Sequence, residues 1–212
     1  MVKALAEIGL SKSNALIAYP GVHEALGVLL ENGVRVIGHT EARPLAVKDR
    51  AKRLNLEPYF DRIYCRERAE AHIGGDFGST EAFTLVELSH HQQKPSPSVL
   101  REICEREDID PSRALYVGDS LFKDVSMANA AGVDVAWAQY GTVSQQDLYP
   151  KLVAISHWRD EEIIRAKEFS RNKASARPDF VLDKSFFDIL SCFGLHIEEG
   201  AGKLSRALSI LW

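Results

Sequence analysis

Two aspartates stand where a predicted strand gives way to a helix, a position suited to binding a hard cation. Residues 114–132 read as a short apolar strand, then Gly-Asp-Ser, then a helix. Asp119 ends the strand, and Asp124 follows five residues later in the first turn of the helix. Ligands of open α/β sheets bind at the carboxyl ends of strands, and Mg²⁺ prefers carboxylate oxygens. We therefore interpret Asp119 and Asp124 as a candidate Mg²⁺ site. The alternative is that Asp119 caps the helix and Asp124 complements its dipole.

Two residues upstream could bind a phosphoryl group. Thr40 ends the apolar run VRVIGHT, and Lys94 stands before Pro95 at the entry to another helix. A hydroxyl and backbone N–H groups at a strand-to-helix turn can hold phosphoryl oxygens. A lysine ammonium can neutralise the charge that develops on such a group. Taken singly, Thr40 could be a plain helix cap and Lys94 a solvated surface lysine.

These residues occur in an order that resembles a known family of enzymes. Tyr19-Pro20-Gly21-Val22 opens a helix before the strand of Thr40, and PDFVLDKSFFDIL, from Pro178, has the form of a last strand and helix. Together with Lys94-Pro95 and the Gly-Asp-Ser stretch, the pattern resembles the haloacid dehalogenase superfamily of Mg²⁺-dependent phosphohydrolases. The resemblance covers nearly the whole chain.

The resemblance implies a role for each candidate residue. Asp119 would bind Mg²⁺, and Asp124 would support the ion or orient Lys94. Thr40 would hold the phosphoryl group, and Lys94 would neutralise its charge and keep the nucleophilic carboxylate ionised. The reaction implied is hydrolysis of a small phosphorylated substrate through an aspartyl-phosphate, with Mg²⁺ as cofactor.

One motif of that family is absent from its expected place. The family's first strand ends in Asp-x-Asp, which supplies the nucleophile, whereas the Asp-x-Asp of this chain lies at 108–110 in a polar turn before Pro111. The resemblance places the missing strand between the strands of Thr40 and Asp119, so these two would have open edges or pair directly. We therefore expect the chain as written to be inactive or nearly so.

The periodicity of apolar residues predicts an α/β fold. Amphipathic helices are expected at 21–32, at 44–54 and from Pro97, and strands at 34–38, 60–64, 114–117 and 133–138, with a possible short strand at 83–88. This alternation predicts a doubly wound, Rossmann-like parallel sheet, with its central first strand missing. Residues 1–190 would form the core, with a loop insertion at 66–93 and a helical segment at 140–177. Residues 191–212 would form a tail whose apolar end docks on the core or a partner.

Composition disfavours some classes of binding partner and indicates a cellular location. The formal net charge is −4 with Lys and Arg scattered, which gives no electrostatic case for nucleic acid or an anionic membrane. Cys65, Cys104 and Cys192 are odd in number and form no Cys-x-x-Cys pair, so we expect reduced thiols and a cytoplasmic protein. No apolar run approaches the roughly 18 residues that span a bilayer, and no signal peptide is visible.

Competing hypotheses differ in the chemistry they assign. A non-catalytic protein with this fold could keep the phosphate and metal sites and act by binding a ligand or partner. An unrelated phospho-receiver domain would need an acidic pair after an early strand, which is not seen. His90 and His91 would point to opposite faces of an extended segment, which disfavours a transition-metal site, and Gly74–Gly78 lacks the Lys-Ser/Thr of a P-loop.

Overall fold

The computed structural model describes residues 16–68, 82–143, 176–195 and 209–211. Residues 69–81 of the predicted insertion at 66–93 and residues 144–175 of the predicted helical segment at 140–177 lie outside these ranges. The domain limits at 190 and 191 therefore remain a prediction.

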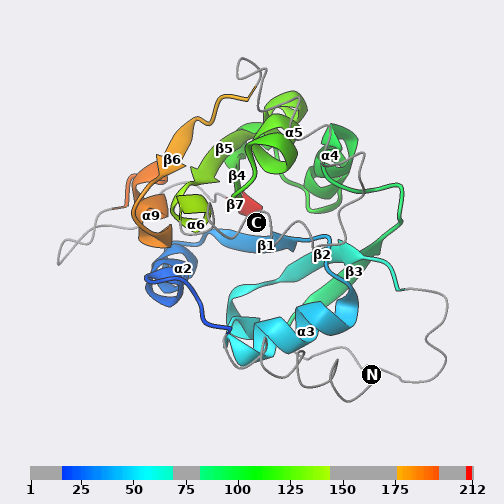
Figure 1. The fold of residues 1–212 in the computed structure, drawn as a ribbon. Helices are drawn as coiled ribbons and strands as arrows, with labels where there is room; N and C mark the ends of the chain where they lie inside the picture. Colours follow the sequence, from blue (N-terminus) through cyan, green and yellow to red (C-terminus); the bar gives the residue numbers. More distant parts are fainter. Residues whose placement is uncertain (1–15, 69–81, 144–175, 196–208, 212) are drawn as a thin grey trace.

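A parallel sheet of seven strands forms the centre of the described structure (Figure 1). Its spatial order is β3-β2-β1-β7-β4-β5-β6, and every neighbouring pair is parallel. The predicted α/β class with a parallel sheet is confirmed. The strands are β1 (Arg35–His39), β2 (Arg62–Arg66), β3 (Thr84–Leu88), β4 (Ala114–Gly118), β5 (Asp134–Ala138), β6 (Phe180–Leu182) and β7 (Ser209–Leu211).

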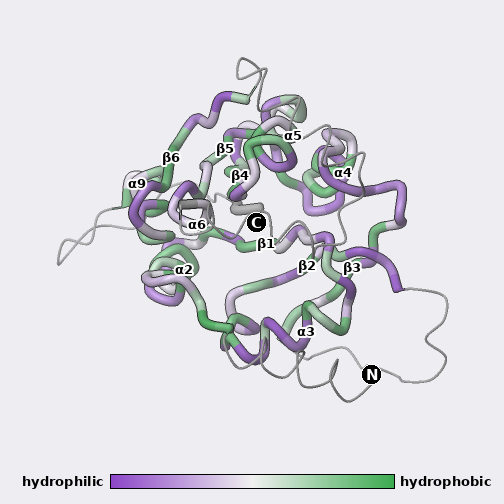
Figure 2. Tube along the Cα trace, in the orientation of Figure 1, coloured by the Kyte–Doolittle hydropathy of each residue, from purple (hydrophilic) through white to green (hydrophobic). Residues whose placement is uncertain are grey.

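Helices cover both faces of this sheet. α2, α3 and α9 pack into one hydrophobic cluster, and α4 and α5 into another. Figure 2 shows hydrophobic and hydrophilic residues alternating along α2 and α4, as expected of helices with one buried face. The helices are α2 (Val22–Glu31), α3 (Pro44–Arg53), α4 (Pro97–Arg106), α5 (Ser126–Ala131), α6 (Tyr140–Val143) and α9 (Ile189–Cys192), with a π-helical turn at Leu121–Val125 before α5.

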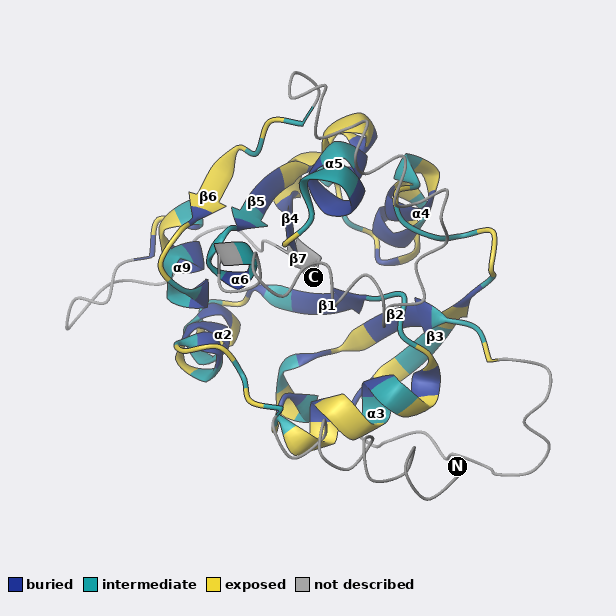
Figure 3. Cartoon of the chain, viewed as in Figure 1, coloured by how far each residue is buried: buried dark blue, intermediate teal, exposed yellow. Residues whose placement is uncertain are grey.

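Alternation along the strands explains why the sheet is doubly covered. Successive side chains of a strand point to opposite faces. Val36 accordingly joins the cluster under α2 and α3, whereas Ile37 joins the cluster under α4 and α5. Tyr116 and Val117 divide in the same way on β4. Figure 3 shows the buried residues concentrated along the central strands and on the inner sides of the helices.

The centre of the sheet departs from the sequence-based expectation. β1 and β4 neither pair directly nor have open inner edges, because β7 lies between them and pairs with both. Leu211 is level with Ile37 of β1 and with Tyr116 of β4. Part of the predicted tail thus forms a central strand, in the position that the resemblance assigns to the missing one.

Among the described residues, no helix is both long enough and apolar enough to span a bilayer.

A buried carboxylate fastens the end of α4 to the first residues of two strands. The Glu107 side chain is 1% exposed, and its oxygens lie 2.6 Å from Arg35 Nη2 and 3.4 Å from Arg62 Nη1. The Tyr64 hydroxyl donates to the same carboxylate at 2.7 Å. Because a buried charge is tolerated only when it is paired, this cluster fixes the packing of α4 on β1 and β2.

Replacing Glu107 should therefore destabilise the fold. We expect Glu107→Ala to lower the free energy of unfolding by about 3 kcal/mol, since it leaves Tyr64 and two arginines without their shared partner. Glu105→Ala removes an exposed carboxylate from the same helix and should change stability by less than about 0.5 kcal/mol. Urea unfolding measures both. Equal effects of the two substitutions would contradict a role for the buried cluster.

Candidate active site

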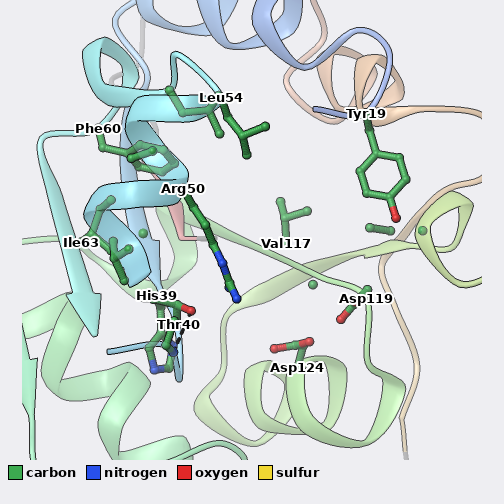
Figure 4. Close-up of a pocket in the computed structure, with 18 of the residues that line it drawn as sticks. Tyr19, His39, Thr40, Arg50, Leu54, Phe60, Ile63, Val117, Asp119 and Asp124 are labelled. Atoms are coloured by element: carbon green, nitrogen blue, oxygen red, sulfur yellow. Dashed lines mark hydrogen bonds between the residues drawn. The ribbon is translucent and has the colours of Figure 1, made fainter. Parts of the chain in front are cut away.

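All four candidate residues line one pocket at the carboxyl ends of the strands. Thr40, Lys94, Asp119 and Asp124 border a cavity of about 380 Å³ (Figure 4). Thr40 follows β1 directly, and Asp119 follows β4. The parallel strands bring these positions to one edge of the sheet although they are far apart in sequence. The structure thus brings together every residue that the sequence singled out.

A buried ion pair joins Lys94 to Asp124. Lys94 Nζ lies 2.8 Å from Asp124 Oδ1, and the two side chains are 13% and 6% exposed. The Tyr116 hydroxyl also donates to Asp124 Oδ1, at 3.3 Å, and Lys94 Nζ lies 5.3 Å from the centre of the Tyr116 ring. Burial alone would lower the pKa of the Lys94 ammonium, but Tyr116 and Asp124 outweigh burial and hold that pKa above its ordinary value. Lys94 is therefore a permanent cation in the pocket.

Asp124 reaches Lys94 because of the local backbone around it. The sequence predicts an α-helical first turn at this point, whereas the structure has a π-helical turn over Leu121–Val125. The wider turn accommodates the five-residue spacing from Asp119. The Ser120 backbone N–H donates to Asp124 Oδ2 at 3.1 Å, so both carboxylate oxygens of Asp124 have partners. Asp124 is thereby fixed in orientation.

Asp119 differs from Asp124 in having a carboxylate without a partner among the described residues. Its backbone carbonyl accepts a hydrogen bond from Trp137 Nε1 at 3.0 Å, and its side chain faces the pocket near Asp124 (Figure 4). Burial within the pocket and the negative charge of Asp124 raise the pKa of Asp119. A bound cation would relieve both effects. This donor set fits Mg²⁺.

The rest of the coordination would have to come largely from water. No group of three or more His, Cys, Asp or Glu side chains forms a metal cluster within the described part of the chain. Mg²⁺ commonly binds through one or two carboxylates and keeps several waters. Asp119, with Asp124 beside it, meets that modest requirement.

Thr40 keeps a proton to donate. Its hydroxyl oxygen accepts from the Ala42 backbone N–H at 3.1 Å, and its own backbone N–H donates to the Tyr64 carbonyl at 2.9 Å. No described residue accepts the hydroxyl proton, which leaves it to a ligand. The neighbouring His39 is buried, and its Nδ1 lies 3.3 Å from the Tyr116 hydroxyl. Burial and the Lys94 charge hold the pKa of His39 well below its ordinary value, so this ring is neutral.

Three features in or beside the pocket were not found from the sequence. Tyr116 reads there as an apolar strand residue, although its hydroxyl contacts Asp124. The ion pair between Lys123 Nζ and Glu41 Oε2, at 2.8 Å, links the segments that follow β1 and β4. Arg50 lines the pocket from α3. Of these, only Arg50 could have been noticed from the sequence, because it is a charged residue within the apolar stripe of its helix.

The family follows from a comparison with known proteins. The model of the haloacid dehalogenase-like hydrolases matches residues 3–132, more than half of the chain. The chain belongs to the haloacid dehalogenase-like hydrolases. The resemblance inferred from the motifs is thereby confirmed.

Among curated proteins, the chain is similar to several phosphatases. It is 33% identical to phosphoglycolate phosphatase from Nitrosospira multiformis over 132 residues, 62% of this chain and 48% of that protein. It is 33% identical to N-acetylmuramic acid 6-phosphate phosphatase from Pseudomonas aeruginosa over 146 residues, 69% of this chain and 52% of that protein. The chain thus spans about half the length of these relatives.

A solved structure with a similar fold is the HAD phosphatase from Thermococcus onnurineus. The similarity covers 83% of this chain and 58% of that one, at 17% identity and a TM-score of 0.48.

The contact between Gly118 and Asp124 gives a test of how the pocket is built. A Cβ at Gly118 would lie 2.3 Å from Asp124 Cβ and 2.4 Å from its Cγ, so Gly118→Ala must push Asp124 away from Lys94. We expect a loss of about 2 kcal/mol in the free energy of unfolding. Thermal and urea unfolding of the purified chain measure the change.

Gly27→Ala is the matched control. Gly27 lies inside α2, and nothing lies within 4 Å of an added Cβ there. This variant should be neutral or gain up to about 1 kcal/mol. A Gly118→Ala protein as stable as the parent would show that Asp124 is not held by this close approach.

Proposed function

We propose that this chain binds the phosphoryl group of a small phosphomonoester and Mg²⁺, as part of a Mg²⁺-dependent phosphohydrolase that acts through an aspartyl-phosphate. The observation that carries this proposal is the buried Lys94–Asp124 ion pair beside Thr40 and Asp119 in one pocket. The phosphatase activities named for the curated relatives support a phosphoester as the substrate.

Lys94 and Thr40 are suited to bind the phosphoryl oxygens. The Lys94 ammonium carries three N–H donors, of which Asp124 takes one at 2.8 Å. The remaining donors and the fixed positive charge can stabilise the negative charge of a phosphoryl group. Thr40 adds its hydroxyl proton from the end of β1. These two donors, one after β1 and one just ahead of α4, would hold the phosphate at the carboxyl edge of the sheet.

Asp119 would hold Mg²⁺ at the end of β4, with Asp124 near it. When bound, Mg²⁺ supplies Lewis-acid stabilisation of phosphoryl oxygens. Asp124 is already committed to Lys94 and Ser120, so it would position that lysine and shape the anionic surroundings of Asp119. The raised pKa of Asp119 supports this assignment, because a carboxylate crowded by a second negative charge gains from a cation.

The attacking carboxylate would have to come from another position. Asp119 and Asp124 are the acidic residues among the described residues lining the pocket, and both have other roles. Thr40 and Asp119 each stand three residues beyond the level of Leu211 in the register of the sheet. β7, the strand at this position, has no acidic residue, so the attacking aspartate would have to come from elsewhere and place its carboxyl group between Thr40 and Asp119. The aspartate oxygen would bond to phosphorus as the ester P–O bond breaks, and the departing alkoxide would take a proton to leave as the alcohol. Water would then attack phosphorus, break the bond to the aspartate and release phosphate.

We also infer a cytoplasmic location. Cys65, Cys104 and Cys192 are free thiols, and the first two are buried. Unpaired cysteines are typical of proteins kept in a reducing compartment.

Binding of orthophosphate in the presence of Mg²⁺ tests the proposal. We expect the 212-residue chain to bind both, and Lys94→Met to weaken phosphate binding tenfold or more, because it removes the cation at the pocket. Asp119→Asn should abolish the rise in melting temperature caused by Mg²⁺. Isothermal titration calorimetry and thermal unfolding provide the two measurements.

Two exposed residues provide matched controls. Lys52→Met makes the same change on the outer side of α3, and Asp134→Asn does so at the first residue of β5, at the opposite edge of the sheet. Both should bind phosphate and Mg²⁺ as the parent does. Turnover of p-nitrophenyl phosphate by this chain should stay at background. Turnover that is lost in Asp119→Asn, or phosphate binding that survives Lys94→Met, would refute the corresponding assignment.

A further inference from the structure

Arg50 occupies a position on α3 where an apolar residue is expected. It lies three residues after Val47 and four before Leu54, so these side chains share one side of the helix. Val47 and Ala51 are buried there, and Leu54 packs against the hydrophobic core. The Arg50 side chain is itself exposed, so its methylene stem crosses the apolar stripe while its guanidinium stays accessible to solvent and to a ligand.

The Arg50 guanidinium extends into the pocket without a partner. Figure 4 shows the side chain running from α3 into the pocket, with its end on the side of His39 and Thr40. No hydrogen bond or ion pair links this guanidinium to another residue of the described ranges. Arg53, one turn further along the same helix, pairs instead with Asp49 at 2.7 Å. Among the described residues, Arg53 therefore has an acidic partner and Arg50 has none.

The surroundings of Arg50 favour an anionic ligand. Leu54, Phe60 and Ile63 form an apolar wall beside it (Figure 4). Asp119 and Asp124 lie across the pocket from Arg50, where Asp124 is already neutralised by Lys94. An anion near the guanidinium would therefore meet a positive charge next to a low-dielectric wall, where ionic hydrogen bonds are strong.

We propose that Arg50 is a specificity-determining residue that binds a second anionic group, a carboxylate in the first place, on a small phosphomonoester. The proposal rests on the phosphate site described above, because it assigns the other end of the same ligand. The phosphoryl group would bind at Thr40 and Lys94, and the carboxylate at Arg50.

The chemistry and size of the pocket agree with such a ligand. A guanidinium offers paired N–H donors that match the two oxygens of a carboxylate. The cavity of about 380 Å³ is at the lower end of the range for small-molecule sites, which suits a compact substrate. Substrates without the second charge would leave Arg50 without an ionic partner in the complex, so they should bind more weakly.

Four probes of the 212-residue chain test this inference by calorimetry in the presence of Mg²⁺. Orthophosphate reports the phosphate site alone. 2-Phosphoglycolate adds a carboxylate, isobutyl phosphate replaces the carboxylate oxygens by methyl groups, and ethylene glycol bisphosphate replaces the carboxylate by a second phosphate. We expect 2-phosphoglycolate to bind about tenfold or more tightly than isobutyl phosphate, as a charge-assisted hydrogen bond predicts. A bisphosphate that binds more tightly than 2-phosphoglycolate would overturn the choice of a carboxylate.

Substitution of Arg50 separates the second anion from the first. Arg50→Leu completes the apolar stripe of α3 and should remove the preference for 2-phosphoglycolate over isobutyl phosphate, while the chain still binds orthophosphate. Arg50→Lys should restore part of the preference. Arg53→Leu, on the same helix, should keep the whole preference for 2-phosphoglycolate. Loss of that preference in Arg53→Leu would indicate a general charge effect and overturn the inference.

If orthophosphate binds but the chain prefers no anionic probe, the inference on Arg50 fails alone. If orthophosphate does not bind, the proposed phosphate site fails with it.

Discussion

The buried ion pair between Lys94 and Asp124 is the interaction on which the pocket depends. Taking both charges out of water is costly, and the cost is recovered only when the partners meet in good geometry. Lys94 lies just ahead of α4, and Asp124 lies in the π-helical turn before α5. The pair therefore fixes the entries of two neighbouring helices relative to each other. Tyr116, on the strand beneath them, completes the contact with its hydroxyl.

Several local features follow from the need to seat Asp124 at this point. Gly118 has no side chain because Asp124 occupies the space where a Cβ would be. The Ser120 N–H and the wider turn hold the second carboxylate oxygen. Asp119 is left at the end of β4 with a carboxylate that no described residue engages. Asp124 thus orients Lys94 and contributes negative charge, whereas the carboxylate of Asp119 is available to a ligand.

The predictable part of the site depended on strand ends. Thr40 and Asp119 each follow an apolar strand, and parallel strands bring their carboxyl ends together, so the sequence could place them at one edge. Lys94 does not directly follow an apolar strand, so only the order of the motifs pointed to it. The partners of Asp124 were harder to foresee, because Tyr116 reads as an ordinary core residue. The Lys123–Glu41 pair joins residues 82 positions apart, and nothing local encodes it.

The centre of the sheet shows why the remaining topology could not be predicted. β7 is three residues long, and its pairing with β1 and β4 depends on contacts with strands far away in the chain. Strand propensity over so short a run carries little information, since strand formation depends on neighbours as much as on residue type. The apolar character of the tail predicted that its end packs on the core or a partner, but it did not predict a position in the sheet. The family resemblance predicted that a strand belongs in that position, but not which one.

A double-mutant cycle on Lys94 and Asp124 tests the central claim most directly. Unfolding of the parent chain, Lys94→Met, Asp124→Asn and the double variant in urea gives the coupling free energy of the pair. If the ion pair organises the pocket, each single variant should lose about 3 kcal/mol, and the double variant should lose about 2 kcal/mol less than their sum. Additive losses, with a coupling free energy near zero, would contradict this account of the site.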